Sequence, residues 1–468
     1  MLKKLFLLMF VFVLVVLTSC GNSGTTEPTV NESNTNTLLE SNINTDTIQV
    51  SPEPPFQNTA SYTYLVEARY HETMGFFNGF APVRYNDLWG FVDTTGREVI
   101  PPQFTWVNHF NDGLAGVQKG YLWGVIDETG QVVIPFEYEH SIHFNEGFAS
   151  VMLSPYPDME WGFMDTTGRI IARNYFATSA FHNGFAAVAV GTDWENMLWG
   201  FIDTTGREII PPTYHFLGSF TESGLALVGV GSDWDSRLWG FIDTTGEIIV
   251  PIVNNQAVHS HDGNLLGLAL VDLEGVWRWF VMDAAGNEIL PLRYQSVGLW
   301  LECGYILFQY NNLWGVKDPS GREVIPPVHH SIGSFVEGLA PVWNEDFTLQ
   351  GYIDRTGREV IPKQFESIGM FNQYGVANFL QGGWEHGTWG LINREGTVIL
   401  PPRFNSISSN NDGFFNVRIG DWETGRWGVI DSTGVNVVPV EYRQLWGSVD
   451  GIIPFMSDDG LWGFIKMG

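Results

Sequence analysis

Four tryptophans, each followed directly by an acidic residue, are the residues of this sequence best suited to contact a ligand. They are Trp194-Glu195, Trp234-Asp235, Trp384-Glu385 and Trp422-Glu423. An indole can stack on a sugar ring while a neighbouring carboxylate accepts hydrogen bonds from its hydroxyl groups. These pairs are therefore a hypothetical glycan-binding set. The alternative is that each indole folds back on the adjacent part of the protein, and it is favoured because large aromatic side chains usually pack.

Signals for catalysis or metal binding are weak. The sequence has no GxSxG, GxxxxGK[ST] or HExxH motif. The Asp-Thr-Thr-Gly stretch at Asp93 is similar to an aspartic protease loop, but it recurs too often for a site that needs one facing pair. The histidines in stretches 259–262 and 329–330 lack an accompanying Cys or His cluster, so solvated loops are expected there. We expect no enzymatic activity, no cofactor and no metal.

One stretch recurs along the chain, and the structure that it forms must hold any ligand-binding residues on the surface. It reads LWGFVDTTGREVIPP from Leu88 to Pro102, and its period of 34 to 40 residues indicates a repeat architecture. We count eleven units, the last one truncated. The expected structural anchors are Trp89, Trp123, Trp161, Trp199, Trp239, Trp279, Trp314, Trp389, Trp427 and Trp462, and Gln350 stands in place of the tryptophan once.

Each unit predicts three short strands. In the first unit these are 80–85, 88–92 and 97–100, separated by a turn at 86–87 and a second turn, Asp93 to Gly96, with the type I preference of Asp first and Gly fourth. Pro101-Pro102 is expected to end the third strand. Both faces of 88–92 are apolar, so neighbouring units must cover both. We expect the anchors to be fully packed, with Gly90 leaving a notch for an aromatic ring.

With these features, the units resemble WG repeats, a bacterial family named for the Trp-Gly dipeptide, which is followed by a strand, an Asp-x-x-Gly turn and a Val-Ile-Pro run. The resemblance covers nearly all of residues 77–468. It implies an all-β tandem array, often on exported proteins, with no established enzymatic activity. The chain departs from the pattern at Gln350, at Phe280 in place of the Gly, at Asn393 in place of the turn Asp, and at 169–172, where the Pro is lost. If every anchor were catalytic, these substitutions would disrupt the site. If each anchor only packs against neighbouring repeat units, single losses can be tolerated.

The predicted architecture is all-β over residues 61–468. Three strands per unit fall short of the four of a propeller blade, and eleven units exceed the usual number in one ring. We therefore expect an open, twisted β-array, with one or two β-propellers as the alternative. The strand at 62–66 would cap the N-terminal end of the array.

The first 60 residues are predicted to export and tether the protein. Residues 1–20 have two lysines and an apolar run typical of a signal peptide, and Leu17-Thr18-Ser19-Cys20-Gly21 resembles a lipobox with Cys20 as the lipidated residue. The alternative is an ordinary signal peptide with a coincidental Cys. Residues 21–60, rich in Asn, Thr, Ser and Pro, predict a disordered tether. Only Cys303 remains, so no intramolecular disulfide can form after Cys20 is lipidated.

Charge and context together favour a binding protein. The net charge of -29 excludes nucleic acid as a plausible partner. We expect an extracytoplasmic, lipid-anchored, non-catalytic repeat protein that binds a protein or glycan. The alternative is a hydrolase of cell-envelope polymers with its site in an atypical unit, such as the one around Trp277-Arg278-Trp279.

Overall fold

The computed structural model describes residues 62–154, 159–271, 275–299, 304–410 and 412–468. The predicted signal peptide, Cys20, the tether and Cys303 lie outside the described residues. Contacts divide the chain into two units, and the larger one, Phe56–Gly468, contains all the residues described below. In this described part, no helix is long and apolar enough to cross a membrane.

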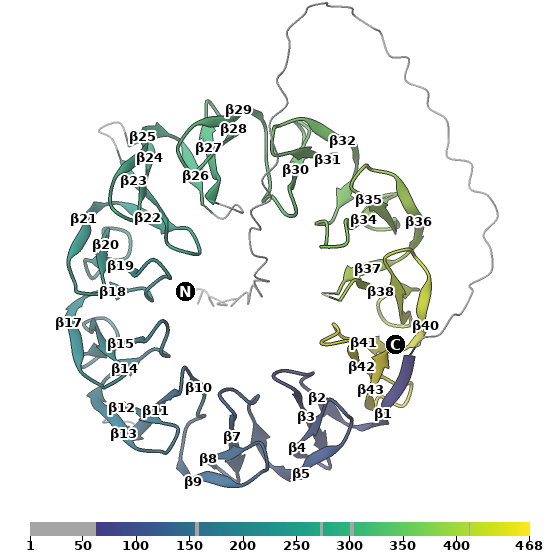
Figure 1. Cartoon of the computed structure of the whole chain (residues 1–468), viewed down its shortest axis with the longest axis horizontal. Coiled ribbons are helices and arrows are strands. Elements are labelled where there is room, and N and C mark those ends of the chain that lie inside the picture. Colours follow the sequence, from purple (N-terminus) through teal and green to yellow (C-terminus); the bar gives the residue numbers. More distant parts are fainter. Residues whose placement is uncertain (1–61, 155–158, 272–274, 300–303, 411) are drawn as a thin grey trace, which may run out of the picture. The chain divides into compact units, whose positions relative to one another are not determined.

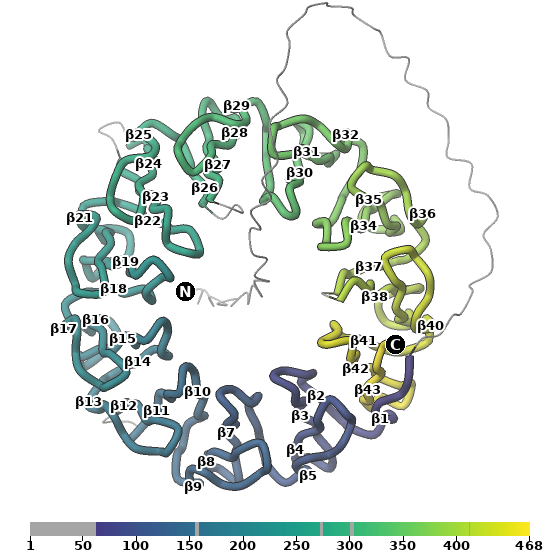
Figure 2. The backbone as a smooth tube through the Cα atoms, viewed as in Figure 1, coloured from purple at the N-terminus to yellow at the C-terminus, as the bar shows by residue number. Residues whose placement is uncertain are grey.

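Eleven small antiparallel sheets form a ring (Figure 1). We number these blades 1 to 11 in chain order. Each blade is a meander that runs from the centre of the ring outwards, and Figure 2 shows the chain repeating this path around the circle. The short innermost strands are β2 (Glu72–Thr73), β6 (Trp106–Val107), β10 (Phe144–Asn145), β14 (Ala177–Thr178), β18 (Phe216–Leu217), β22 (Gln256–His259), β26 (Ser296–Gly298), β33 (Ser367–Ile368), β37 (Ser406–Ser409) and β41 (Gln444–Leu445).

Three longer strands complete each blade. The second strands are β3 (Phe80–Tyr85), β7 (Leu114–Lys119), β11 (Phe148–Ser154), β15 (Phe185–Val190), β19 (Leu225–Val230), β23 (Leu265–Val271), β27 (Ile306–Tyr310), β30 (Leu339–Trp343), β34 (Val376–Gln381), β38 (Phe414–Ile419) and β42 (Ile452–Met456). The third strands are β4 (Leu88–Asp93), β8 (Leu122–Asp127), β12 (Glu160–Asp165), β16 (Leu198–Asp203), β20 (Leu238–Asp243), β24 (Trp277–Asp283), β28 (Leu313–Lys317), β31 (Gln350–Asp354), β35 (Thr388–Asn393), β39 (Arg426–Asp431) and β43 (Trp462–Met467). The outer strands are β5 (Glu98–Phe104), β9 (Val132–Tyr138), β13 (Ile170–Tyr175), β17 (Glu208–Tyr214), β21 (Ile248–Asn254), β25 (Glu288–Tyr294), β29 (Glu323–His329), β32 (Glu359–Phe365), β36 (Val398–Phe404), β40 (Asn436–Tyr442) and, in blade 11, β1 (Tyr62–Tyr70).

The ring is closed by its two ends. Strand β1 pairs antiparallel with β43, with Val66 opposite Phe464 and Tyr70 opposite Trp462, so the start of the ring supplies the outer strand of the last blade. The expectation of an open array is therefore wrong, and the alternative of a propeller is confirmed as a single ring of eleven blades. The strand at 62–66 does not cap an array. It completes blade 11, which the sequence made look truncated.

Ten of the eleven sheets have four strands, where the sequence predicted three per unit. The strand that was not predicted is the innermost one of each blade. It is only two to four residues long and lies in a segment without an alternating hydrophobic pattern, so the sequence does not indicate it. In blade 8 the sheet of β30, β31 and β32 has three strands, and a single bridge between Ile332 and Val342 stands where the innermost strand would be.

The hydrophobic core is divided among the gaps between neighbouring blades. One cluster joins Phe91 and Ile100 of blade 1 to Phe110, Val117 and Ile126 of blade 2, and equivalent clusters follow around the ring. Each third strand thus buries both of its faces, as its apolar pattern predicted. The core position is the residue two after the anchor: Phe91, Phe201 and Phe241 are almost completely buried. The anchor itself is buried in Trp89, Trp123, Trp239 and Trp462 but only half-buried in Trp199 and several others, so full packing of every anchor was a wrong expectation.

The glycine after the anchor is required by a bulge in the outer strand. In blade 4, Phe201 pairs with Ile210 and Trp199 with Tyr214, so a step of two residues on β16 opposes a step of four on β17. The extra backbone crosses Gly200, where a Cβ atom would lie 2.6 Å from the Pro212 nitrogen. The notch is therefore filled chiefly by backbone, in place of the aromatic ring we expected. The outer strand also continues through its prolines, which an edge strand tolerates because its outward N–H groups have no partner.

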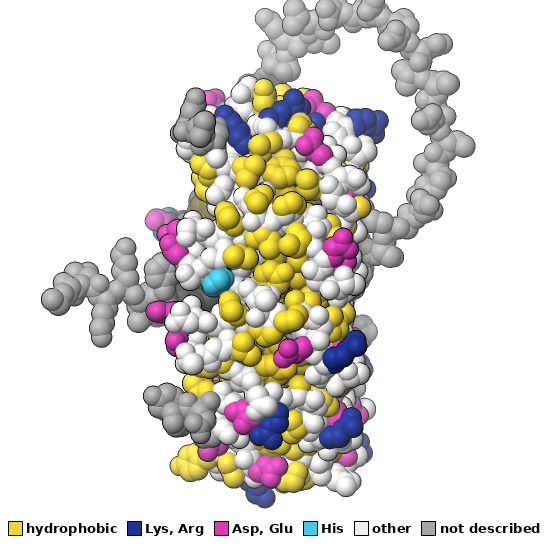
Figure 3. Space-filling view, turned by 90° about the vertical axis from the view of Figure 1, so that its left-hand side faces the viewer, with side chains coloured by type: hydrophobic (Ala, Val, Ile, Leu, Met, Phe, Trp, Pro, Cys, Tyr) yellow, Lys and Arg dark blue, Asp and Glu magenta, His cyan; other side chains and the backbone are white. Residues whose placement is uncertain are grey.

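The connections between strands alternate between the two faces of the ring. We call the face with the connections between second and third strands the loop face. The opposite face, where the Asp-x-x-Gly turns join third to outer strands, is the turn face. The curved outer wall between the two faces carries a band of apolar side chains (Figure 3). The outer strands also expose apolar residues such as Ile248, Val253 and Leu292.

Candidate functional site

The four tryptophans of the candidate glycan site all lie on the loop face. Trp194, Trp234, Trp384 and Trp422 each occupy the connection between the second and third strands of blades 4, 5, 9 and 10. Trp194 and Trp234 are both 62% exposed, Trp384 is 74% exposed and Trp422 is 79% exposed. The favoured alternative, that these indoles fold back into the protein, is therefore wrong for the greater part of each ring.

Each exposed indole rests on a second group that fixes its orientation. Trp194 meets Phe176 edge-on, with ring centroids 5.1 Å apart. Trp234 contacts Phe216 at 5.9 Å and its own blade's anchor, Trp239, at 5.4 Å. T-shaped arrangements of this kind are favourable for aromatic pairs.

Two of the indoles also lie on a guanidinium group. The Cζ atom of Arg237 is 4.9 Å from the ring centroid of Trp234 and 5.7 Å from that of Trp239. Arg418 takes the same place in blade 10, 4.7 Å from Trp422 and 5.6 Å from Trp427. The two arginines come from different strands, since Arg237 precedes the third strand and Arg418 lies on the second. Cation–π contact thus holds both tryptophans in place.

The acidic residues of these loops have two separate roles. Asp193, before Trp194, accepts backbone hydrogen bonds from Glu195 at 3.0 Å and Asn196 at 2.9 Å. The Asn196 side-chain amide lowers the pKa of Asp193, so this carboxylate stays charged and shapes the loop. Within the described residues, the carboxylates after the tryptophans accept no hydrogen bond from the protein and are exposed to solvent: Glu195, Asp235, Glu385 and Glu423.

The structure does not bring the four tryptophans into one pocket. They stand on separate blades, and the pairs 194/234 and 384/422 each span one step between neighbouring blades. Two exposed aromatic residues in equivalent connections, Tyr121 in blade 2 and Phe347 in blade 8, were missed from the sequence, where only a Trp followed directly by an acidic residue was taken as the signal. Comparing every unit's second connection for any aromatic residue would have found them.

The turn-face aspartates are structural. Asp165 accepts hydrogen bonds from the backbone N–H groups of Thr167 at 3.0 Å and Arg169 at 3.1 Å. The Thr167 hydroxyl and these bonds lower the pKa of Asp165 to about 2. The same pattern recurs at Asp93, Asp127, Asp203, Asp243, Asp283, Asp318, Asp354 and Asp431. Their oxygens are occupied within their own turns, so the aspartates are not presented as a facing catalytic pair.

The remaining candidates show no assembled chemistry. Asp262 is bound to Ser260 and Asn264 in its own turn, and His259 contacts the Ser260 carbonyl. Within the described ranges, no group of three or more His, Cys, Asp or Glu side chains could hold a metal ion. Trp277 is the first residue of strand β24 in the atypical unit considered for a hydrolase.

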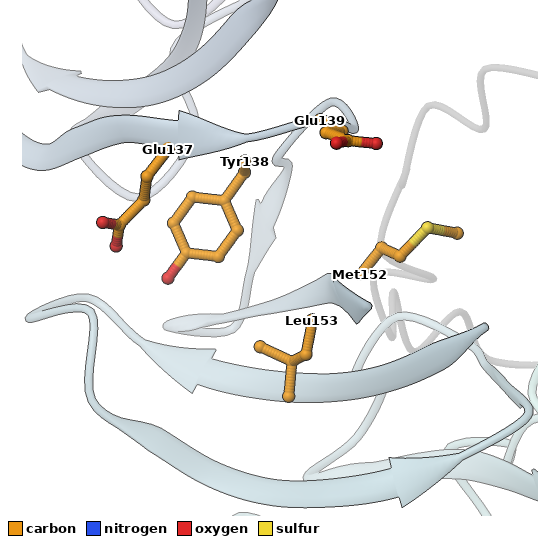
Figure 4. Close-up of a pocket in the computed structure, with 5 residues that line it drawn as sticks. All are labelled: Glu137, Tyr138, Glu139, Met152 and Leu153. Carbon is orange, nitrogen blue, oxygen red and sulfur yellow. The ribbon is translucent and has the colours of Figure 1, made fainter. Parts of the chain in front are cut away.

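A pocket of about 340 Å³ lies between blades 2 and 3. It is lined by Glu137, Tyr138 and Glu139 on one side and by Met152 and Leu153 on the other (Figure 4). Burial raises the pKa of Tyr138, so its phenol stays protonated. The pocket thus combines two exposed carboxylates with a phenol and two apolar side chains, and these residues include no nucleophile paired with a base.

The fold and the recurring units define a class of protein: a closed, all-β propeller of eleven tandem repeats. The chain belongs to the WG containing repeat family, whose model matches eleven segments: 63–89, 89–123, 123–154, 161–191, 199–234, 239–277, 279–314, 314–342, 351–383, 389–421 and 427–465. No curated protein matches the chain.

Solved structures show distant likeness. A chain described as "Crystal structure of the eukaryotic initiation factor" is 11% identical, with a TM-score of 0.38, and the match covers 72% of this chain and 89% of that one. Another, "Crystal structure of the tricorn protease", is 10% identical, with a TM-score of 0.23 and coverage of 84% and 46%. These TM-scores are too low to support any inference about function.

Proposed function

We propose that this chain is a non-catalytic binding protein that holds a glycan through its loop face. The observation that carries the proposal is the set of four recurring tryptophans, which expose 62–79% of their surface. Their orientation is fixed from below by an aromatic ring or a guanidinium group. Exposing so much apolar surface costs solvation free energy and gives the fold little in return. Each indole is also followed by an acidic side chain that suits sugar hydroxyl groups.

We place this activity outside the cytoplasm of a bacterium, on a lipid anchor. The support is the sequence Leu17-Thr18-Ser19-Cys20-Gly21 after an apolar run, which suits cleavage before Cys20 and acylation of its thiol. Several acyl chains on one residue give stable membrane attachment, which one chain does not. The loop face would then present the tryptophans to polymers of the cell envelope or its surroundings.

Binding is tested with residues 56–468, the compact unit, on a glycan array and by affinity electrophoresis. The variant changes Trp194, Trp234, Trp384 and Trp422 to alanine. A matched control changes four exposed apolar residues of the outer strands to alanine: Ile248, Val253, Leu292 and Val328. We expect glycan binding by the wild type and the control, and a loss of at least tenfold in the tryptophan variant. Equal binding by the tryptophan variant would refute the proposed site.

Anchoring is tested with the full-length chain carrying Cys20→Ser. We expect the variant to leave the membrane fraction or to remain unprocessed, because the acylated thiol is lost. Correct processing together with unchanged membrane association would rule out the lipoprotein.

A further inference from the structure

Aromatic side chains stand on the loop face well beyond the four tryptophans. Five further blades expose one within the connection between second and third strands or at the strand ends that border it: Tyr85, Tyr121, Trp277, Tyr310 and Phe347. Nine of the eleven blades therefore expose an aromatic residue within this connection or at a strand end next to it. The equivalent connection of blade 3 lies largely outside the described residues, and that of blade 11, Ser457 to Leu461, has no aromatic residue.

Blade 8 keeps such a ring although it differs from the other blades in two ways. It has Gln350 in place of the anchor tryptophan and a sheet of only three strands. It still presents Phe347, which is 60% exposed. Its backbone has a φ of +59°, a region that side chains with a Cβ atom rarely adopt. Hydrogen bonds to Asn344 and Asp346 hold this loop in place.

Tyr121 in blade 2 is likewise an aromatic residue that the core does not use. It is the second residue of the two-residue turn Gly120-Tyr121 and is 91% exposed, so its ring contributes almost nothing to the core. Gly120 has a φ of +67° and takes the position of this turn that favours glycine, so residue 121 is not restricted in the way that Asn86-Asp87 and Asn311-Asn312 are in the equivalent turns of blades 1 and 7. The fold therefore neither requires a tyrosine at position 121 nor buries its ring, and the ring is free to contact a ligand.

We propose that the loop face forms one binding surface for a long, neutral polysaccharide, which crosses several blades and stacks its sugar rings on successive aromatic residues. This inference rests on the function proposed above and extends it from two pairs of tryptophans to the whole face. Each aromatic contact with a sugar is weak. Contacts linked along one polymer reinforce each other, because each bound ring raises the local concentration of the next. Affinity is thus expected to rise steeply with the length of the polymer.

The charges on this face select against anionic ligands. The chain has a net charge of -29, and the exposed carboxylates of Glu195, Asp235, Glu385 and Glu423 lie beside the rings. A neutral sugar can donate its hydroxyl groups to them, whereas an anionic polymer is repelled. The same carboxylates disfavour insertion of the face into a lipid headgroup region, where they would lose hydration.

The test compares two alanine variants of residues 56–468 in affinity electrophoresis. One changes the four tryptophans of the candidate site, and the other changes the five further aromatic residues: Tyr85, Tyr121, Trp277, Tyr310 and Phe347. The outer-wall variant described above is the control. The probes are the neutral polymers glucomannan, arabinoxylan and dextran, fragments of each with up to six sugar rings, and anionic alginate. Phosphatidylcholine vesicles are added as a separate probe.

We expect at least one neutral polymer to retard the wild type, and the five-residue variant to bind that polymer at least tenfold more weakly. Its affinity for six-ring fragments should change much less. A five-residue variant that binds the polymer like the wild type overturns this inference and leaves the four-tryptophan site standing. Retardation by none of the neutral polymers overturns both. Vesicle binding that is lost in the five-residue variant, without polymer binding, assigns the face to membranes and also overturns it. If the five-residue variant melts early, the single changes Tyr121→Ala and Phe347→Ala, at the two most exposed of these positions, decide between these outcomes.

Discussion

The two faces of the ring are built on opposite plans. On the turn face, blade after blade repeats the same Asp-x-x-Gly turn with the same hydrogen bonds, as at Asp165 and Asp318. On the loop face, the equivalent connections differ in length and sequence, yet most of them expose an aromatic side chain. The Asp-x-x-Gly turns, which repeat in sequence, therefore help to hold the ring together. The loop-face positions vary in sequence but keep an exposed aromatic side chain, and these side chains are free to contact a ligand.

Substitutions within the repeats support this division. Asn393 replaces the turn aspartate in blade 9, and its side-chain oxygen still accepts the Thr397 N–H at 2.8 Å. The turn thus tolerates replacement of Asp by Asn, because the side chain keeps an oxygen that accepts the hydrogen bond. The glycine of the same turns is constrained further, since in blade 1 Gly96 has a φ of +81° and a Cβ atom there would lie 2.5 Å from the Leu65 oxygen of the neighbouring strand.

The largest expected effect comes from the core between the faces. Phe201→Ala should lower the free energy of unfolding by about 3–5 kcal/mol, because this ring is almost completely buried between blades 4 and 5. Trp199→Ala, one pleat closer to the loop face on the same strand, should cost clearly less, because its side chain is half-buried. Chemical denaturation measures both. A larger loss of unfolding free energy for Trp199→Ala than for Phe201→Ala would contradict the expectation that burial increases from the loop face to the core.

A smaller effect is expected where the outer strand crosses the third strand. Gly200→Ala should cost about 1–3 kcal/mol, the usual range for overpacking, because the new methyl group meets the backbone of Pro211 and Pro212. Gly218→Ala is the matched control, since its methyl group would lie 3.6 Å from Leu227, an ordinary contact. Equal melting temperatures for the two variants would show that the bulge can move aside.

The smallest structural effect is the pH dependence of the turn face. The pKa values of Asp165 and Asp318 are lowered from 3.8 to about 2 by hydrogen bonds from Thr167 and Ser320. A lowered pKa in the folded state stabilises the fold above pH 3.8, and this contribution is lost as the pH falls toward 2. The double variant Asp165→Asn, Asp318→Asn should therefore lose less melting temperature between pH 5 and pH 2.5 than the wild type does. An identical loss in both proteins would contradict a role for these carboxylates.

Much of this organisation could be predicted from the sequence. The period, the strand-turn-strand order and the role of Asp93 as a turn former all followed from local chemistry and are confirmed. The closure of the ring could not be predicted, because it depends on pairing between strands some 400 residues apart in sequence, Tyr62–Tyr70 and Trp462–Met467. The innermost strands, two to four residues long, were invisible for lack of a pattern.

The candidate site was predicted in part. The sequence identified the four tryptophans and their acidic neighbours, but the propensity of large aromatic residues to pack pointed to the wrong environment for them. Their exposure comes from their position in the connections between second and third strands, outside the buried sheets. Tyr121 and Phe347 were missed because only a Trp followed directly by an acidic residue was used as the signal.

The central claim, that the turn face holds the ring together while the loop face binds, is tested most directly by two variants in the same two assays. One changes Trp194, Trp234, Trp384 and Trp422 to alanine, and the other changes Asp127, Asp165, Asp203 and Asp318 to alanine. Thermal melts and glycan binding well below the melting temperature are measured for both. The tryptophan variant should melt like the wild type, within about 0.5 kcal/mol per site for exposed residues, and should lose binding. The aspartate variant should melt earlier and bind normally. A tryptophan variant that melts far below the wild type, or an aspartate variant that loses binding while still folded, would contradict the division between the two faces.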